Sequence, residues 1–395
     1  MKKIILIISI LFITGCTQIK MLDLSNKSLK DIEKYAEIHK IKLEVAYQYN
    51  DSILKDKVIS QNISKNTKIK KNSNLKIVIS LGKNLEQLYK ENNVNEIGRI
   101  PVMMYHGIED KINTFIGGNI DKEGYQRTKS AFINDLEFYY KEGYRMIRLN
   151  DYVNDKIDVS LGKSPIVLTF DDGLVNNIKV TGLDTNGNII IDPNCAIGIL
   201  EQFKKKYPDY NVTATFFLNG WLFRQEKYNE KILNYLIDNG YDIGNHSYNH
   251  VNFKNISSIK SEEEIARVYE LLEKYIPNKY VNIVALPFGS PNKKNHDNFS
   301  HIIMANYNNK TYHTISTLQV GWESDYSPFS SNFDKIFIKR IRAYDNNGTN
   351  FDIKYSFDKI KYTKYISDGD VNTIVIPKEN KIYLKDNNTL KVVTY

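Results

Sequence analysis

Only two of the 395 residues are cysteine, so no disulfide framework holds this fold together. Tryptophan is as scarce, with two residues against 28 tyrosines and 17 phenylalanines. Hydrophobic residues make up 42% and charged residues 25% of the chain, as in an ordinary globular protein. This composition excludes wholesale disorder, collagen and polytopic membrane folds. The length suits two or three domains.

The amino terminus has the pattern of an export signal. Two lysines precede an almost wholly apolar run over 4–13, which is shorter than the ~20 residues that span a bilayer. The run ends in Ile13-Thr14-Gly15-Cys16, which resembles the lipobox of bacterial lipoproteins. The resemblance implies a signal peptide over 1–15 and a lipid on Cys16. We therefore expect an extracytoplasmic protein, lipid-anchored to the bacterial cell membrane. An ordinary cleaved signal with a chance cysteine is the alternative.

The chain is basic, with 54 Lys+Arg against 46 Asp+Glu and a formal net charge of +8. The excess is spread along the sequence, which favours a solvated surface. Attraction to an anionic wall or membrane surface is the functional alternative. For an exported lipoprotein we expect no nucleic-acid partner.

Residues 22–84 have the pattern of one small α+β unit. A capping-box-like Ser28 precedes apolar residues at helical spacing, and alternating residues over 41–49 and 75–79 predict strands. The order of these pieces, with "KLEVAYQYND" and "KVISQNISKNTKIKKNSNLKIVISLG", resembles a PASTA domain, although two customary prolines are missing. The resemblance implies an association with peptidoglycan. A spacer role is equally open. Residues 85–98 are polar and predict a linker or a linking helix.

From residue 99 onward, apolar strand-like runs alternate with helical patterns. The strand-like runs are 100–105, 165–170, 214–218 and 283–286, and the helical patterns are 132–141, 197–206, 230–239 and 262–275. This alternation predicts an α/β fold with a parallel sheet or an α/β barrel. Active sites of such barrels lie at the carboxyl ends of the strands, so the residues that follow each strand are the candidates.

Two strand ends carry groups suited to a metal. Asp171 and Asp172 follow the second strand, and adjacent carboxylates repel each other unless a cation or proton lies between them. His246 and His250 are four residues apart, which fits one face of a helical turn that shares a metal. A simple turn and a pair of surface histidines are the structural alternatives.

Two further strand ends are weaker signals by themselves. His106 directly follows the first strand, where a lone histidine is more often structural than catalytic. Pro287-Phe288-Gly289 follows the fourth strand and predicts a rigid turn, which by itself need have no further role.

Together these strand ends resemble the polysaccharide deacetylases of the NodB-homology group, family 4 of the carbohydrate esterases. The resemblance lies in "TFDDG", "ATFFLNGWLF", "HSYNH" and "LPFG", which occur in the family's order across residues 99–320. It implies a distorted (β/α) barrel and a divalent metal, usually Zn²⁺.

The resemblance also implies roles for individual residues. Asp172, His246 and His250 would bind the metal, and Asp171 would be the general base. The turn Pro287-Phe288-Gly289 would contact the substrate. Two imidazoles and one carboxylate leave positions on the metal for water and for the amide oxygen, which suits hydrolysis.

The chain departs from the common family pattern in two places. Ala285 stands where the family usually has arginine, and no histidine follows His313, so the usual late general acid is missing. The subgroup that deacetylates poly-N-acetylglucosamine takes its acid from an early Tyr-His at a strand end. "MYHG" matches that arrangement, which implies that His106 is the general acid.

We therefore expect a deacetylase domain over 99–395, with an insertion over 176–211. Its expected function is metal-dependent removal of N-acetyl groups from peptidoglycan or from a secreted N-acetylglucosamine polymer. The alternative is a non-catalytic glycan-binding lipoprotein on an inactive deacetylase fold.

Overall fold

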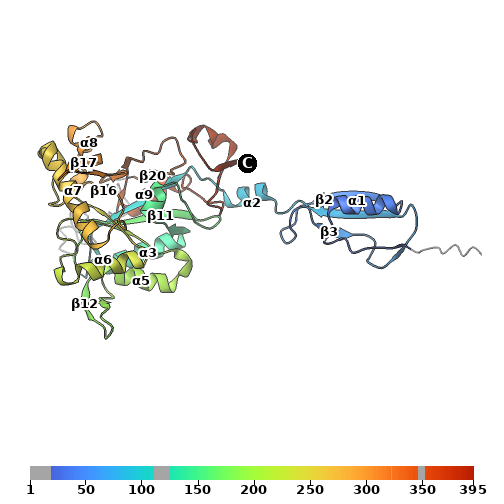
Figure 1. The fold of residues 1–395 in the computed structure, drawn as a ribbon, viewed down its shortest axis with the longest axis horizontal. Coiled ribbons are helices and arrows are strands. Elements are labelled where there is room, and N and C mark those ends of the chain that lie inside the picture. The colour runs from blue at the N-terminus through green and yellow to red at the C-terminus, as the bar shows by residue number, and fades with distance from the viewer. Residues whose placement is uncertain (1–18, 111–124, 322, 346–351) are drawn as a thin grey trace, which may run out of the picture. The chain divides into compact units, whose positions relative to one another are not determined.

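A computed structural model describes residues 19–110, 125–321, 323–345 and 352–395. The chain divides into two compact units, Met1–Leu88 and Tyr89–Tyr395, which are described separately (Figure 1). The predicted signal peptide and Cys16 lie outside the described residues.

The first unit is one helix on a three-stranded sheet. Its elements are β1 (Ile19–Lys20), α1 (Leu29–Ile38), β2 (Lys42–Gln48), β3 (Val58–Gln61), β4 (Lys68–Ile69) and β5 (Asn74–Ser80). The sheet order is β2-β5-β3, with β2 parallel and β3 antiparallel to β5. Ser28 caps α1 by accepting the amide N–H of Asp31, as the capping-box pattern predicts. Leu75, Ile77 and Ile79 are buried, which confirms the predicted alternation.

The second unit is built around a curled parallel sheet. Within the described residues this sheet has nine strands, in the order β21-β19-β16-β15-β14-β11-β7-β22, with β10 beside β11. The strands are β7 (Val102–Tyr105), β10 (Tyr144–Met146), β11 (Ser164–Phe170), β14 (Thr215–Leu218), β15 (Asp242–Asn245), β16 (Ile283–Ala285), β19 (Ser316–Leu318), β21 (Phe337–Ile338) and β22 (Ile341–Arg342).

The two ends of this sheet are joined by one short segment. β21 pairs with β19 at one end and β22 pairs with β7 at the other, yet only Lys339 and Arg340 separate β21 from β22. The sheet therefore curls until its ends approach each other, which confirms the expected distorted (β/α) barrel.

Helices accompany the sheet. They are α3 (Lys129–Lys141), α4 (Leu149–Val153), α5 (Ala196–Lys206), α6 (Asn229–Asp238), α7 (Ser258–Tyr275), α8 (Asp297–Ile303) and α9 (Ile353–Ile360). A further helix, α2 (Leu85–Asn92), spans the boundary between the two units. The four predicted helices of the second unit are α3, α5, α6 and α7. α7 begins four residues earlier than predicted, because Ser257 caps it by accepting the amide N–H of Lys260.

Small strand pairs lie outside the main sheet. They are formed by β6 (Arg99–Ile100), β8 (Gly107–Glu109), β9 (Gln126–Thr128), β12 (Val180–Leu183), β13 (Ile189–Ile191), β17 (Met304–Tyr307), β18 (Lys310–His313), β20 (Asp325–Tyr326), β23 (Thr373–Ile376) and β24 (Lys391–Thr394). The predicted strand 100–105 is thus two strands. Pro101 separates them because it has no N–H for a ladder, and β6 pairs with β20 instead.

The predicted insertion contains the β12–β13 hairpin and the whole of α5. Asn186-Gly187 lies in the turn between β12 and β13, where this pair of residues is favoured. The N-cap of α5 is Cys195, whose Sγ accepts the amide N–H of Gly198.

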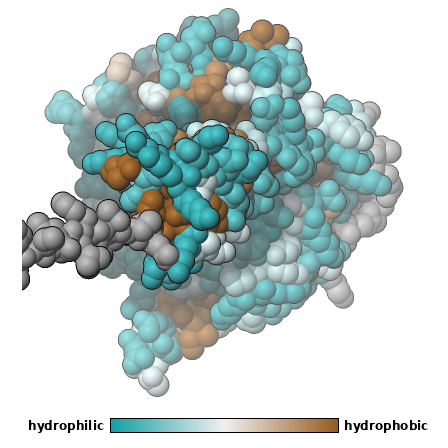
Figure 2. Space-filling view, turned by 90° about the vertical axis from the view of Figure 1, so that its right-hand side faces the viewer, coloured by the Kyte–Doolittle hydropathy of each residue, from teal (hydrophilic) through white to brown (hydrophobic). Residues whose placement is uncertain are grey.

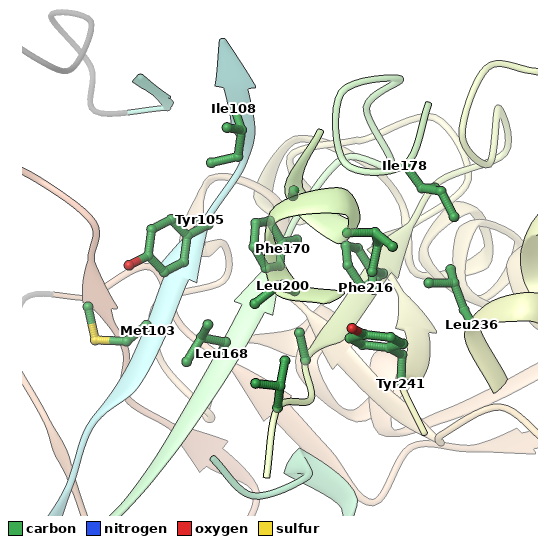
Figure 3. Close-up of a cluster of buried hydrophobic side chains, with 14 of the residues drawn as sticks. Met103, Tyr105, Ile108, Leu168, Phe170, Ile178, Leu200, Phe216, Leu236 and Tyr241 are labelled. Carbon is green, nitrogen blue, oxygen red and sulfur yellow. The ribbon is translucent and has the colours of Figure 1, made fainter. Parts of the chain in front are cut away.

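Aromatic rings from three neighbouring strands fill the core at their carboxyl ends (Figure 3). Tyr105 of β7, Phe170 of β11 and Phe216 of β14 stack in a row, with centroids 5.3 and 5.0 Å apart. Because these rings are buried, the residues that follow them are held at a rigid edge of the sheet.

The outer surface is mostly polar where Figure 2 shows it, with hydrophobic residues in small separate groups. None of the described helices combines the length and the apolar character needed to cross a membrane.

Candidate active site

The strand register brings the predicted residues together. Phe170 pairs with Tyr105, so Asp171 and His106 follow neighbouring strands at the same level. The amide of Asp171 donates to the carbonyl oxygen of Tyr105. On the next pair of strands Leu218 is opposite Asn245, which places His246 at the same edge.

Asp172, His246 and His250 form a compact triad. One ligand atom of each lies within 4.8 Å of the others. Asp172 Oδ1 is 3.3 Å from His246 Nε2 and 3.3 Å from His250 Nε2. Metal–ligand bonds of ~2.0–2.1 Å at tetrahedral angles separate two donor atoms by about 3.3 Å, so these spacings fit one ion such as Zn²⁺.

Unpaired buried atoms support the same interpretation. His246 Nδ1 lies 2.8 Å from the carbonyl oxygen of Ala285, a contact that requires the proton on Nδ1, so Nε2 is the nitrogen that a metal would bind. His246 Nε2 and Asp172 Oδ1 are both buried and have no hydrogen-bond partner among the described residues. Buried polar atoms are rarely left unpaired, so the two atoms fit ligands that face a common ion.

The segment that carries the histidines is a loop, not the predicted helical turn. Ser247 and His250 have left-handed φ values of 56° and 52°, which a helix does not allow. The buried Glu264 holds the loop from α7, since its carboxylate accepts both the amide N–H and the side-chain amide of Asn249. The histidines therefore converge through loop geometry rather than helical spacing.

Asp171 is almost fully buried and is held by Arg340. The guanidinium donates from its two terminal nitrogens to Asp171 Oδ1 and Oδ2, both at 2.8 Å. Arg340 also donates to Thr169 Oγ1 and to the carbonyl oxygen of Gln319, and its side chain has no exposed surface. This bidentate pair fixes the plane of the Asp171 carboxylate.

His106 faces the same carboxylate. Its Nε2 lies 3.9 Å from Asp171 Oδ2, and its Nδ1 is buried without a hydrogen-bond partner in the described part of the chain. The ring packs edge-on against Tyr125. His106 thus lies beside Asp171, outside the triad.

The charges of the site keep both carboxylates ionised. Burial raises the pKa of Asp171, but the guanidinium of Arg340 and the charges of His246 and His106 together lower it more, and the result is below the ordinary value. Burial also raises the pKa of Asp172, and the close contact with His246 and the charges of the nearby histidines together outweigh it. Burial lowers the pKa of His106, and the charges of Asp171 and Asp172 only partly oppose this.

The turn after β16 contributes an exposed aromatic ring. Phe288 is 61% exposed, has a φ of 57°, and its ring lies 4.7 Å from that of His250. Pro287 is buried, and Gly289 has a φ of 61° with Val320 close to where its Cβ would be. Phe288 is therefore the member of this turn that can touch a ligand near the triad.

Sequence reasoning missed two residues that support the site. Arg340 lies 169 positions after Asp171, and only its place in the apolar run "IFIKRIRA" marks it. Asn219 follows β14, and its side-chain amide donates to the carbonyl oxygen of Asp172. Asn219 lies within the motif "ATFFLNGWLF", but nothing in the sequence indicated a role for it, and Arg340 belongs to no local pattern that indicates chemistry.

The α/β barrel brings a possible metal-binding triad and a second carboxylate together at its strand ends, which are groups that suit hydrolysis. Residues 158–302 match the family model described as polysaccharide deacetylase, and residues 19–81 match the PASTA domain model. The chain thus carries a domain of the polysaccharide deacetylase family after a PASTA domain. The second unit is accordingly an N-deacetylase that acts on a glycan.

Several solved structures resemble parts of the chain. The deacetylase PplD of Streptococcus pyogenes is 17% identical over 62% of this chain and 92% of its own, with a TM-score of 0.43. The peptidoglycan deacetylase PdaC of Bacillus subtilis is 26% identical over 35% and 54%, with a TM-score of 0.25. The extracellular region of the Ser/Thr kinase PrkC from Staphylococcus aureus is 31% identical over 17% and 24%, with a TM-score of 0.16. These TM-scores are below 0.5, so the assignment depends on the family matches. No curated protein matches the sequence.

Proposed function

We propose that the second unit hydrolyses N-acetyl groups of an N-acetylglucosamine-containing cell-surface polysaccharide, either peptidoglycan or an exopolysaccharide. The observation that carries the proposal is the convergence of Asp172, His246 and His250 beside the buried carboxylate of Asp171. In this proposal the triad holds a divalent metal, preferably Zn²⁺. A metal held there would polarise the acetyl carbonyl and acidify a water molecule.

Asp171 is the proposed general base. It takes a proton from the attacking water as the water adds to the acetyl carbon. Its lowered pKa keeps the carboxylate ionised, and Arg340 holds the plane of both oxygens while the proton arrives. The two carboxylates thus have separate tasks. Asp171, which Arg340 holds, accepts the proton, whereas Asp172 faces His246 and His250 of the triad.

His106 is the proposed general acid. The bond between the acetyl carbon and the sugar nitrogen breaks only if the leaving amine receives a proton. His106 Nε2 lies 3.9 Å from Asp171 Oδ2, so acid and base are near enough to serve one scissile bond. Phe288 borders the site and is the proposed contact for the sugar ring.

We also propose that the PASTA domain brings the chain to peptidoglycan and that Cys16 carries a lipid anchor. The first proposal is supported by the family match over residues 19–81, and the second by the sequence pattern that ends at Cys16. In cells fed an alkyne fatty acid, the wild-type chain should be labelled and membrane-bound, and Cys16→Ser should be neither. A label that persists in Cys16→Ser would overturn the anchor.

Metal content and acetate release test the enzymatic proposal together. The chain from Ile19 onward should bind one divalent ion per molecule and release acetate from N-acetylglucosamine oligomers or muropeptides. His246→Ala should lose both the ion and the activity, whereas Asp171→Asn should keep the ion and lose acetate release. A bound ion without acetate from any glycan would favour a glycan-binding protein on an inactive fold.

A further inference from the structure

The loop after β14 forms a cavity next to the triad. The cavity has a volume of about 700 Å³ and is lined by Gly220, Trp221, Arg224, Glu226 and Asn229. The amide of Gly220 donates to the carbonyl oxygen of Tyr248, and a Cβ at Gly220 would come within 2.7 Å of the Tyr248 ring. Because Tyr248 lies between the two histidines of the triad, the cavity begins directly beside the metal-binding segment.

Trp221 is held in place at its backbone and exposed at its ring. Its amide donates to Asn219 Oδ1, and Asn219 donates in turn to the carbonyl oxygen of Asp172, both at 3.1 Å. The next two residues, Leu222 and Phe223, are buried, yet 53% of Trp221 is exposed. The loop is therefore fixed to the triad while a large apolar ring remains in solvent. Such a ring is a ready platform for the apolar face of a sugar.

The loop also stores backbone strain. Leu222 and Arg224 have φ values of 49° and 56°, and non-glycine residues in this region cost about 1–3 kcal/mol each. Strain of this kind concentrates at ligand-binding sites, where the surrounding structure enforces it. Within this loop Leu222 and Phe223 are buried, while Trp221 and Arg224 on either side of them line the cavity.

Among the described residues, the polar side chains of the cavity have few partners. No ion pair or side-chain hydrogen bond involves the exposed Arg224 or Glu226 within the described ranges. Asn229 is only 8% exposed, and its Oδ1 has no hydrogen-bond partner in the described part of the chain. A guanidinium fork of this kind matches the geometry of a carboxylate.

We propose that this cavity is a subsite for the sugar next to the N-acetylglucosamine that is deacetylated, with Trp221 stacked on its ring and Arg224 bound to a carboxylate on it. The lactyl group of N-acetylmuramic acid supplies such a carboxylate on glycan strands whose stem peptides have been removed, whereas poly-N-acetylglucosamine has none. The inference rests on the proposed deacetylase function, and it selects peptide-free strands of peptidoglycan as the substrate.

Substrates with and without the carboxylate distinguish the contact of Trp221 with the sugar ring from the contact of Arg224 with the carboxylate. Acetate release would be measured with a tetrasaccharide of alternating N-acetylglucosamine and N-acetylmuramic acid, with chitotetraose, and with 4-nitrophenyl acetate. Trp221→Ala should lower kcat/KM about tenfold for both tetrasaccharides, since one stacked ring contributes roughly that factor. Arg224→Gln should lower it about tenfold for the muramic tetrasaccharide alone. Neither variant should change ester hydrolysis.

Lys227→Gln is the matched control, because Lys227 is an exposed cation of the same loop that does not line the cavity. Equal losses on both tetrasaccharides in Arg224→Gln, or no loss, would overturn carboxylate recognition. An unchanged kcat/KM in Trp221→Ala would overturn the stacking.

A binding measurement separates failure of the subsite from failure of the proposed function. In a Trp322→Phe background Trp221 is the sole tryptophan, so its fluorescence reports on the cavity. The deacetylated muramic tetrasaccharide should change this fluorescence, and Arg224→Gln should weaken its binding about tenfold. If the wild-type chain releases no acetate but shows this binding, the function is wrong and the subsite stands. If it releases acetate but Arg224→Gln binds as tightly, the subsite is wrong.

Discussion

Replacing Arg340 by methionine should affect stability and the pH profile together. Arg340 is fully buried and makes two 2.8 Å hydrogen bonds to Asp171, which is itself 1% exposed. Removing one partner of a buried ion pair leaves the other charge uncompensated, which costs about 3–5 kcal/mol. We therefore expect a free energy of unfolding lower by that amount near neutral pH.

The sign of the pH effect follows from the charge that is lost. In the wild type the pKa of Asp171 is depressed, so its contribution to stability is present above the ordinary aspartate pKa and is lost as the pH falls through the folded-state value. Without the guanidinium, the largest charge that opposes the effect of burial is gone, so the pKa of Asp171 should rise above its wild-type value. The base is then protonated at a higher pH, and the acidic limb of the kcat/KM profile should move upward.

The assay is acetate release as a function of pH, combined with urea unfolding at two pH values. Arg340→Lys should recover only part of both effects, because an ammonium cannot make the paired contact. Lys339→Met is the control, since Lys339 makes only a surface pair with Glu323, and such pairs contribute about 0–1 kcal/mol. An acidic limb that stays in place in Arg340→Met would refute the assigned role of Arg340.

Three further predictions concern other side chains. His106→Ala should lower kcat by ~10²–10⁴-fold with unchanged metal content, and loss of the metal would instead make His106 part of its binding site. Glu264→Gln should weaken metal binding about 10- to 100-fold in a chelator competition, because Glu264 holds the loop between the two ligand histidines. An unchanged affinity would mean that the loop keeps its conformation without Glu264. Burial, reinforced by the charge of Asp368, raises the pKa of Glu96 from 4.5 to about 8, so the wild type should lose stability as the pH rises from about 4.5 to 8. Glu96→Gln should abolish that slope in a series of Tm values, and identical slopes would contradict the assignment.

The strand ends could be predicted because their information is local. A buried apolar run followed by Asp171-Asp172 or by His106 defines both the strand and the edge at which it ends. Parallel pairing then brings those edges together, since residues that follow paired positions must be neighbours. Fold class and candidate residues thus followed from short segments and one rule of sheet topology.

Other features depend on contacts that no local pattern encodes. The left-handed conformations of Ser247 and His250 are uncommon for residues of these types, so the sequence pointed to a helical turn. β21 and β22 have two residues each, too few for a periodic signal. Arg340 between them is identified only by its partner in space.

The segment that joins β21 to β22 has two tasks at once. It connects the two end strands of the curled sheet, and it carries Arg340, whose guanidinium binds the proposed base Asp171. The closure of the sheet and the support of the proposed base therefore depend on the same segment. This segment lies after residues 158–302, which the family model matches. A frameshift or a proteolytic cut in the segment around Arg340 would therefore remove the support of Asp171, even if every recognisable motif remained intact.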